Sequence, residues 1–182
     1  MNKQSLIWLF GLLFVAVVLA VATWFSLNET ASRSLKESAA GVALTEPGET
    51  ALYTDLSGNS LDLSNYLGKI LIVHSWASWC PQCVTELQFL DQLGLEYQDR
   101  LQVLAINRAE PAATAERYLA AVAAGDRIKF LLDPADHFYT SNNGYAMPET
   151  IVYEESGAIV LHVHGEIDKV ELKTRLEELL SE

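Results

Sequence analysis

Apolar runs and polar breaks alternate along the chain in an order that predicts an α/β domain after residue 50. Residues 70–76 form a continuous apolar run, which is typical of a buried central strand, and residues 101–107 are expected to form another buried strand. Residues 81–97 and 112–124 have apolar positions at helical spacing, and Gly125 closes the second helix. Further strands are expected at residues 51–55, 60–63, 130–132, 150–153 and 159–164, and a last amphipathic helix at residues 170–180. This order predicts an α/β fold with a mixed central sheet flanked by helices.

Turn-forming residues join the shorter predicted strands in pairs. Ser57-Gly58-Asn59 separates the first two short strands, which predicts an N-terminal β-hairpin extension of the domain. Residues 154–157 separate the last two strands and predict a second hairpin, directly before the final helix.

An apolar segment near the amino terminus has the length of a membrane-spanning helix. Residues 6–25 are almost wholly apolar, and about 20 such residues are enough to cross a bilayer. Trp8 and Trp24 lie near its two ends, where interfacial aromatic side chains are common. We therefore expect a single-pass transmembrane anchor within residues 1–27, followed by a linker at residues 28–48 that is rich in serine and glycine.

A cleaved signal peptide is the alternative interpretation of this segment. Ala20-Val21-Ala22 has the small residues of a cleavage site, although the apolar run is longer than an ordinary signal core. Under either interpretation, residues 49–182 form a domain on the periplasmic or other extracytoplasmic side of a bacterial-type inner membrane.

The charge of the chain limits its partners. The formal net charge is −12, and all 24 acidic but 11 of the 12 basic residues follow residue 27, which gives that part a charge of −13. A domain this acidic repels nucleic acid and anionic headgroups, so no nucleic-acid partner is expected. Contact with the membrane is assigned to the N-terminal helix.

The two cysteines of the chain stand in the motif Trp79-Cys80-Pro81-Gln82-Cys83, directly after a predicted buried strand. Positions three apart share one helical face, so the two sulfur atoms can form a disulfide. Backbone amides and the dipole at a helix start stabilise a thiolate, and a thiolate is the species that attacks a disulfide. We predict that Cys80 is the nucleophile and that Cys83, one turn later and more buried, resolves the mixed disulfide.

Other interpretations of the cysteine pair are weaker. A zinc site needs more ligands at suitable spacing than one C-x-x-C pair offers. A structural disulfide that closes so short a loop would stabilise the fold little. No metal and no cofactor are therefore expected, apart from the redox-active disulfide itself.

The segment from Lys69 to Cys83, KILIVHSWASWCPQC, resembles the active-site strand and motif of membrane-anchored thioredoxin-like proteins of the TlpA/ResA/DsbE (CcmG) family. Val84 to Leu93 continues the similarity, and so does GYAMPET at residues 144–150. The resemblance covers about residues 50–180. It implies a thioredoxin-like fold and a thiol–disulfide oxidoreductase that reduces disulfides outside the cytoplasm, notably during cytochrome c maturation.

The resemblance also implies roles for individual residues. Pro148 corresponds to the family's cis-proline, and the backbone of Met147 before it would bind an extended substrate chain by strand addition. An ordinary turn proline is the alternative. Glu86, three residues after Cys83, corresponds to a glutamate that handles protons near the cysteines; otherwise it is a solvated helix residue. Tyr145 corresponds to an aromatic residue near the active site, or else is a packed loop side chain.

Trp79 is expected to shield the disulfide and shape the substrate surface, with a core position as the alternative. His74 departs from the family, which often has asparagine there, and we expect a hydrogen-bonded core histidine. His162 and His164 share one strand face by alternation. Two imidazoles could hold copper, but without a further ligand pattern a structural role is favoured.

Three functions follow from these residues. The first is a membrane-tethered reductant of exported proteins such as apocytochrome c, re-reduced by a membrane thiol–disulfide electron donor because the chain has no other cysteines. The second is an oxidant or general thiol donor for other exported proteins, including copper-site assembly. The third is a non-catalytic binding module or copper chaperone on the same fold.

Overall fold

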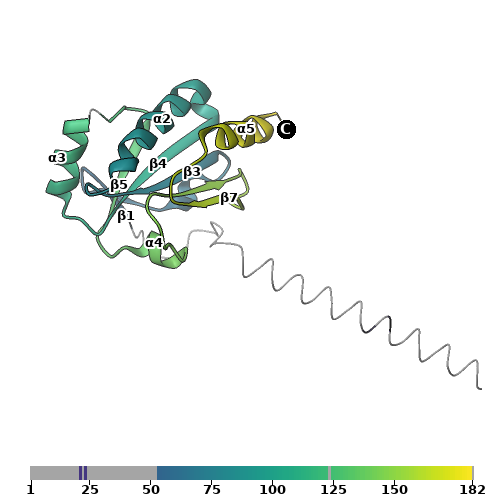
Figure 1. Ribbon diagram of the computed structural model, residues 1–182, viewed down its shortest axis with the longest axis horizontal. Helices are drawn as coiled ribbons and strands as arrows, with labels where there is room; N and C mark the ends of the chain where they lie inside the picture. The colour runs from purple at the N-terminus through teal and green to yellow at the C-terminus, as the bar shows by residue number, and fades with distance from the viewer. Residues whose placement is uncertain (1–20, 22, 24–52, 123, 182) are drawn as a thin grey trace, which may run out of the picture. The chain divides into compact units, whose positions relative to one another are not determined.

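The computed structural model describes residues 21, 23, 53–122 and 124–181. Its strands are β1 (Tyr53–Asp55), β2 (Ser60–Leu61), β3 (Ile70–Trp76), β4 (Leu101–Arg108), β5 (Ile128–Asp133), β6 (Glu149–Tyr153) and β7 (Ile159–His164). Its α-helices are α2 (Pro81–Tyr97), α3 (Ala112–Val122), α4 (His137–Ser141) and α5 (Lys169–Leu180), and two 3-10 turns are η1 (Leu63–Tyr66) and η2 (Gln98–Arg100). In Figure 1, α2 and α5 cover one side of the sheet and α4 lies on the other.

The seven strands form one mixed sheet in the order β2-β1-β5-β4-β3-β6-β7. Strands β3, β4 and β5 are parallel, with Ile70 beside Leu101 and Val103 beside Ile128. Strand β6 runs antiparallel to β3, with Ser75 opposite Glu149, and β7 runs antiparallel to β6. This thioredoxin-like arrangement confirms the predicted α/β fold with a mixed sheet.

Two hydrophobic clusters fill the two faces of this sheet. The first cluster packs α2, α3 and α5 on the sheet and includes Ile72, Trp76, Cys80 and Cys83. The second contains the alternate strand positions, among them Val73, together with side chains from α4 and the N-terminal hairpin. Successive residues of β3 therefore face opposite clusters, as the period of a strand requires. Because both faces are covered, β3 consists of buried residues throughout.

The N-terminal hairpin is present, but its second strand is shorter than predicted. Strand β1 pairs antiparallel with β2, and β1 also pairs with β5, which attaches the hairpin to the sheet. The expectation of a strand to residue 63 is wrong, because β2 ends at Leu61 and η1 begins two residues later. The side chain of Asp62 accepts a hydrogen bond from the N–H of Ser64 at 2.8 Å and starts this helical turn.

The other differences concern short elements and chain ends. Helix α4 was not predicted, because its five residues are too few to show helical periodicity. Residues 1–27 and 28–48, the predicted anchor and linker, lie outside the described residues apart from Val21 and Thr23, which are helical. In the part of the chain that the structure describes, no helix has both the length and the apolar character to cross a membrane.

Candidate active site

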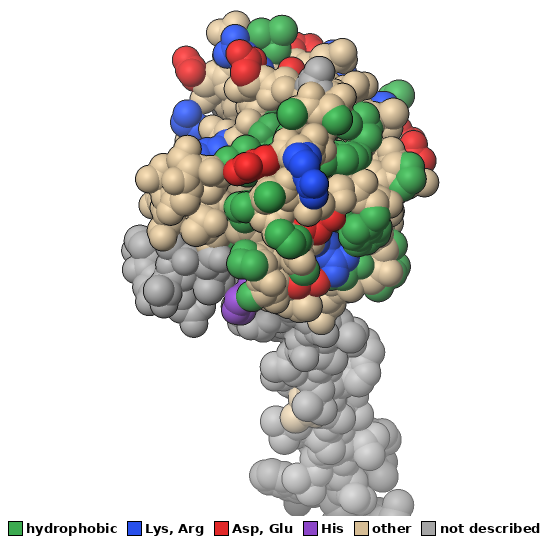
Figure 2. Space-filling view, turned by 90° about the vertical axis from the view of Figure 1, so that its left-hand side faces the viewer, with side chains coloured by type: hydrophobic (Ala, Val, Ile, Leu, Met, Phe, Trp, Pro, Cys, Tyr) green, Lys and Arg blue, Asp and Glu red, His purple; other side chains and the backbone are tan. Residues whose placement is uncertain are grey.

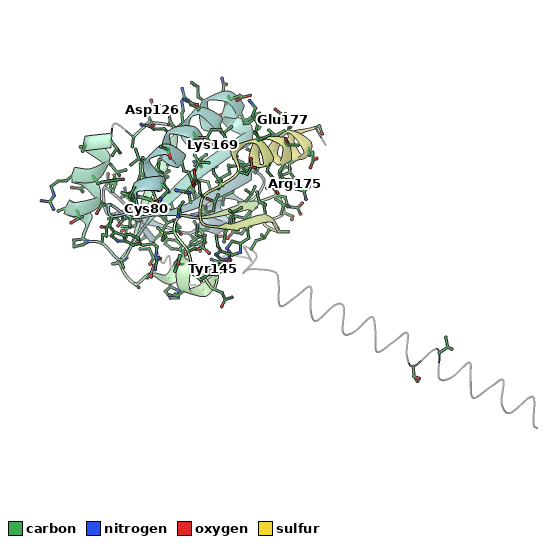
Figure 3. All side chains as sticks on the ribbon, viewed as in Figure 1. Cys80, Asp126, Tyr145, Lys169, Arg175 and Glu177 are labelled. Atoms are coloured by element: carbon green, nitrogen blue, oxygen red, sulfur yellow. A yellow bond between two sulfur atoms is a disulfide. The ribbon has the colours of Figure 1, made fainter. Side chains whose placement is uncertain are left out.

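The cysteine pair lies at the start of α2, directly after the loop that follows β3. Cys80 is the residue before the first helical turn, with an extended backbone, and Pro81 begins the helix. Proline suits this position because its missing N–H would have no partner in the helix. The Sγ atoms of Cys80 and Cys83 are bonded at 2.08 Å, as the spacing predicted. Figure 3 shows Cys80 at this end of α2.

Both cysteines are buried in the disulfide state. Cys80 is 2% exposed and Cys83 is 0% exposed, so the predicted nucleophile is the one that keeps contact with solvent. Trp79, beside Cys80 in the chain, is 61% exposed, which rules out the core position considered for it. Trp76, by contrast, is fully buried and stacks on Tyr118 with ring centroids 5.5 Å apart. Of the two tryptophans near the cysteine motif, Trp79 is therefore the one that faces solvent.

A carboxylate that sequence reasoning missed holds this loop in place. Glu110 accepts hydrogen bonds from the N–H and the hydroxyl of Ser78, at 2.8 and 2.5 Å, and from the side-chain amide of Asn107 at 2.7 Å. Burial opposes ionisation of Glu110, but these hydrogen bonds outweigh it and lower the pKa of the carboxyl. Because β3 and β4 are parallel, their carboxyl ends meet at one edge, and this was the available signal.

The residues around Pro148 have the predicted backbone. The Met147–Pro148 peptide bond is cis, so the alternative of an ordinary turn proline is wrong. Met147 is half-buried and packs against the cluster that contains both cysteines. Gly144 approaches the ring of Tyr139 so closely that an added Cβ would lie 2.4 Å from it, which holds the start of this loop against α4.

Tyr145 is one of the most exposed aromatic side chains of the described residues, at 77%. Its ring lies 4.1 Å from the ring of His164 on β7, so the tyrosine packs on a partly exposed histidine and not in the interior. Figure 3 shows Tyr145 beside α4 and away from Cys80. The tyrosine therefore contacts the histidine strand rather than the sulfur atoms in this state.

Glu86 is buried on the same face of α2 as Cys83, one helical turn later. Its side chain is 0% exposed, which excludes the alternative of a solvated helix residue. One carboxyl oxygen accepts a hydrogen bond from the N–H of Ile167 at 3.0 Å. Burial raises the pKa of Glu86 to about 7, the Ile167 hydrogen bond partly offsets this, and Glu166 and Lys169 act in opposite directions. The carboxyl can therefore bind or release a proton near neutral pH.

His74 lies beside Glu86 on the disulfide face of β3. Its Nδ1 atom is 2.9 Å from the hydroxyl of Thr150 and 3.7 Å from a carboxyl oxygen of Glu86. Burial lowers the pKa of His74 to about 3, so the imidazole is neutral. This confirms the predicted hydrogen-bonded core histidine. The Thr150 partner was missed because the two residues are 76 positions apart in the chain.

The surroundings of this site differ in polarity. Figure 2 views the domain from the side of α3 and shows hydrophobic side chains spread over that face among scattered charged ones.

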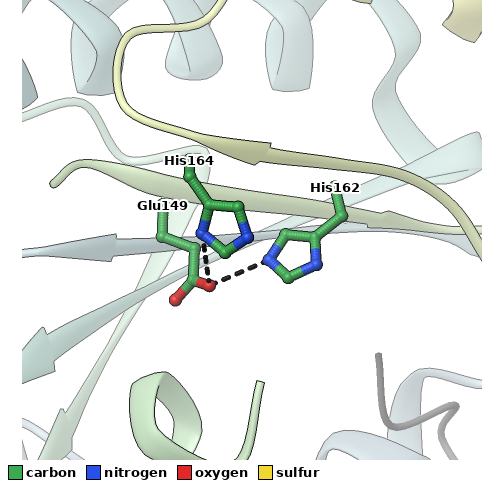
Figure 4. Close-up of side chains that lie close together, drawn as sticks. All are labelled: Glu149, His162 and His164. Atoms are coloured by element: carbon green, nitrogen blue, oxygen red, sulfur yellow. Dashed lines mark hydrogen bonds and ion pairs between the residues drawn. The ribbon is translucent and has the colours of Figure 1, made fainter. Parts of the chain in front are cut away.

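His162 and His164 do share one strand face, as predicted, and Glu149 of the neighbouring strand lies between them and β3 (Figure 4). They belong to the sheet face opposite the disulfide, because Glu149 alternates with Thr150, the partner of His74.

The sequence profile of the redoxin family matches residues 38–180. The thiol-disulfide oxidoreductase ResA of Halalkalibacterium halodurans is 25% identical over 183 residues, covering 100% of this chain and 95% of that one. The thioredoxin-like protein YneN of Bacillus subtilis is 29% identical over 172 residues, covering 93% and 96%. A secreted Mycobacterium tuberculosis disulfide oxidoreductase homologous to E. coli DsbE shares the fold, with a TM-score of 0.60 at 21% identity, covering 71% and 95%. With its disulfide at the start of α2, the chain belongs to the redoxin family, as a thioredoxin-like thiol–disulfide oxidoreductase of the ResA type.

Proposed function

We propose that this protein is a membrane-tethered reductant of disulfides in exported proteins, with the cysteine pair of apocytochrome c as the leading substrate. The observation that carries the proposal is the Cys80–Cys83 disulfide at the start of α2 with a buried carboxyl, Glu86, on the same helical face. A reductant needs an attacking thiolate and a group that takes the proton of the second thiol. Cys80 is proposed to supply the thiolate and Glu86 to take the proton.

In the proposed reaction the reduced protein supplies two electrons. The Cys80 thiolate attacks one sulfur of the substrate disulfide, forms a mixed disulfide and expels the other substrate sulfur as a thiolate, which takes a proton from water. Cys83 then loses its proton and attacks Sγ of Cys80. The mixed disulfide breaks, the second substrate sulfur leaves and is protonated, and the Cys80–Cys83 disulfide is restored. The substrate is reduced to a dithiol as this protein is oxidised.

Glu86 is the proposed acceptor of the Cys83 proton. Its pKa of about 7 lies close to ambient pH, where a carboxyl is an effective proton carrier. The neighbouring His74 is neutral, so it does not pair with the carboxylate as a cation. The ionised form of Glu86 takes the proton from the resolving thiol, and the protonated form returns it when the disulfide is reduced again.

Substrate binding is assigned to the loop around the cis-proline. The backbone of Met147 is proposed to add the substrate chain as an extended strand, with the exposed Trp79 and Tyr145 flanking it. Hydrogen bonds to backbone groups recognise an extended chain without requiring one sequence. This suits a protein that acts on cysteine pairs in more than one exported polypeptide.

Location and electron supply complete the proposal. The apolar segment at residues 6–25 is proposed to anchor the chain in the inner membrane with its domain on the extracytoplasmic side. Because the chain contains two cysteines in all, electrons must come from the dithiol of a second protein. Anchoring raises the effective concentration of a donor in the same membrane.

The test is the reduction potential of the full-length protein, equilibrated with glutathione or dithiothreitol, with Cys80→Ala as the control. A value near about −270 mV, as in thioredoxin, supports a reductant. A value near about −120 mV, as in the oxidant DsbA, would contradict the proposal and favour the oxidation of exported proteins.

The substrate is tested in the same preparation. The reduced protein should reduce the disulfide of an apocytochrome c peptide that contains the haem-binding cysteine pair, and Cys80→Ala should not. Equal rates of reduction of that peptide and of an unrelated disulfide peptide would contradict a preference for apocytochrome c. They would indicate that the protein reduces exported proteins in general.

A further inference from the structure

Three potential ligand groups meet at the β6–β7 edge of the sheet. Nε2 of His162 lies 2.8 Å from Oε1 of Glu149, and Nδ1 of His164 lies 3.4 Å from the same oxygen. The ligand atoms of all three side chains lie within 4.8 Å of one another. Figure 4 shows both imidazole rings directed at the carboxylate. Strand pairing explains this convergence, because Glu149 lies opposite His164 and the next residue on the same face, Ile151, lies opposite His162.

One carboxyl oxygen of Glu149 has no partner in this cluster. Glu149 is 0% exposed, and its Oε2 atom has no hydrogen-bond partner among the described residues. Nδ1 of His164 likewise has no hydrogen bond among them. A buried carboxylate oxygen without a partner costs free energy, so native structures rarely leave one without a compensating group. The two imidazoles are 17% and 18% exposed, which leaves a way in from solvent.

We propose that Glu149, His162 and His164 form a binding site for a divalent transition-metal ion, for which Zn²⁺ is the representative. Two imidazole nitrogens and one carboxylate oxygen are a ligand set that suits Zn²⁺ and its neighbours in the first transition row. Three protein ligands leave a fourth position for water or another small ligand. No metal was predicted here, because the sequence pattern groups the two histidines but does not reveal the third ligand.

The separations within the cluster suit a single ion. Ligand atoms that bind one tetrahedral zinc at about 2 Å stand roughly 3.3 Å apart. The contacts from Glu149 to the two histidines, 2.8 and 3.4 Å, bracket that value. All three ligand atoms lie within 4.8 Å of one another, so an ion would replace the carboxylate–imidazole contacts after shifts of the two imidazole side chains.

The cysteines are not part of this site. Glu149 lies on the same face of the sheet as Ile151, which belongs to the second hydrophobic cluster. Cys80 and Cys83 belong to the first cluster, on the other face. In the disulfide state the sulfur atoms are bonded to each other and offer no thiolate ligand. Metal binding should therefore persist in a variant that lacks both cysteines. This separates the proposal from a copper site built on the C-x-x-C pair.

Tyr145 gives the site a surface neighbour. Its exposed ring lies 4.1 Å from the ring of His164, and the rings of His162 and His164 lie 4.2 Å apart. A bound ion would hold the imidazole of His164 in one position, and the Tyr145 ring packs against that imidazole. Tyr145 also precedes the Met147–Pro148 bond, so the metal would steady the loop that carries it.

The experiment measures Zn²⁺ binding to the full-length chain, oxidised and without a polyhistidine tag, by competition with a chromophoric chelator. We expect one ion per chain. Because loss of an outer-shell partner alone costs about 10- to 100-fold in metal affinity, His162→Ala and His164→Ala should each weaken binding at least about tenfold. Co²⁺ should give the visible absorption of a low-coordinate site in the wild type and lose it in both variants.

His137→Ala is the matched control, because His137 is an exposed histidine on α4 outside the cluster. It should bind Zn²⁺ as the wild type does, and so should the Cys80→Ser/Cys83→Ser double variant. Glu149→Gln completes the set, with circular dichroism to verify folding, but the surface-accessible histidine variants decide the question. Unchanged affinity in both histidine variants, an equal loss in His137→Ala, or loss of binding in the double cysteine variant would overturn the proposal.

Discussion

Nδ1 of His74 lies 3.7 Å from Oε2 of Glu86, and both side chains are fully shielded from solvent. The pair is not a salt bridge, because burial lowers the pKa of His74 to about 3 and raises that of Glu86 to about 7. Each group resists its charged form for the same reason, the loss of solvation. In the interior beside the disulfide, Glu86 is therefore the group that titrates at neutral pH.

Glu86→Gln should remove a pH-dependent part of the stability. The pKa of Glu86 is about 7 in the folded protein and near 4.5 in the unfolded chain, so the folded state binds the extra proton. Its contribution to the free energy of unfolding is fully present below about pH 4.5. It is lost as the pH rises through 7, and it amounts to up to about 3 kcal/mol.

Urea unfolding of the oxidised wild type and of Glu86→Gln over this pH range measures the effect. His74, Glu166, Lys169 and the Ile167 N–H face the carboxyl in both proteins, so their own contributions largely cancel in the difference. Glu116→Gln, an exposed carboxyl on α3, is the control and should follow the wild type. A difference between wild type and Glu86→Gln that stays constant with pH would contradict a raised pKa.

Cys83→Ala should trap the mixed disulfide. Without the second sulfur, nothing in the chain can displace the substrate from Cys80, so a covalent adduct should persist after reaction with a disulfide peptide. Mass spectrometry under non-reducing conditions detects the adduct. The reversed variant, Cys80→Ala, should accumulate far less, because Cys83 is fully buried. Equal adducts in the two variants would reject the assignment of Cys80 as the nucleophile.

Glu110→Ala should loosen the loop that carries Trp79 and Cys80. The change removes the hydrogen-bond acceptor for Ser78 and Asn107. A hydrogen bond to a charged group contributes about 1.5 to 3 kcal/mol to the free energy of unfolding, and less where the group is partly exposed. Since Glu110 is half-buried, we expect a total loss of about 1 to 3 kcal/mol in the free energy of unfolding.

Hydrogen exchange provides the second readout for Glu110→Ala, because the Ser78 amide should exchange faster. The pKa of Glu110 is lowered in the folded state, so its contribution is present at neutral pH and lost on acidification. Glu116→Ala, on the adjacent helix, is the matched control. Unchanged exchange at Ser78 would show that the loop is held by other contacts.

The elements that sequence predicted best are those with a complete pattern of their own. Strand β3 and helix α2 have the predicted bounds, because one is a continuous apolar run and the other starts at Pro81 and keeps helical spacing. The cysteine pair was found for the same reason, since its spacing and its place after a strand are local. The cis form of Pro148 followed from the family resemblance and not from the residue itself.

The contacts that sequence missed join residues far apart in the chain. Glu110 reaches Ser78 across 32 positions, and Glu149 reaches His162 across 13. Glu110 belongs to no recognisable motif, the motif around Pro148 assigns no role to Glu149, and an acidic residue is more often exposed than buried. Strand register, which places Glu149 opposite His164, is the fact that was lacking.

Pro148 and the first two residues of β6 lie in three different surroundings. Pro148 closes the cis peptide, Glu149 faces the histidines of β7, and Thr150 faces His74. Inserting one residue directly after Pro148 would move the last two to the opposite faces of the sheet, because side-chain direction alternates. A carboxylate would then enter the disulfide side, and the inserted residue would take the position of the proposed ligand. The spacing here is therefore as constrained as the two residues between the cysteines, and single-residue insertions at this point should be far more damaging than insertions at the β6–β7 turn.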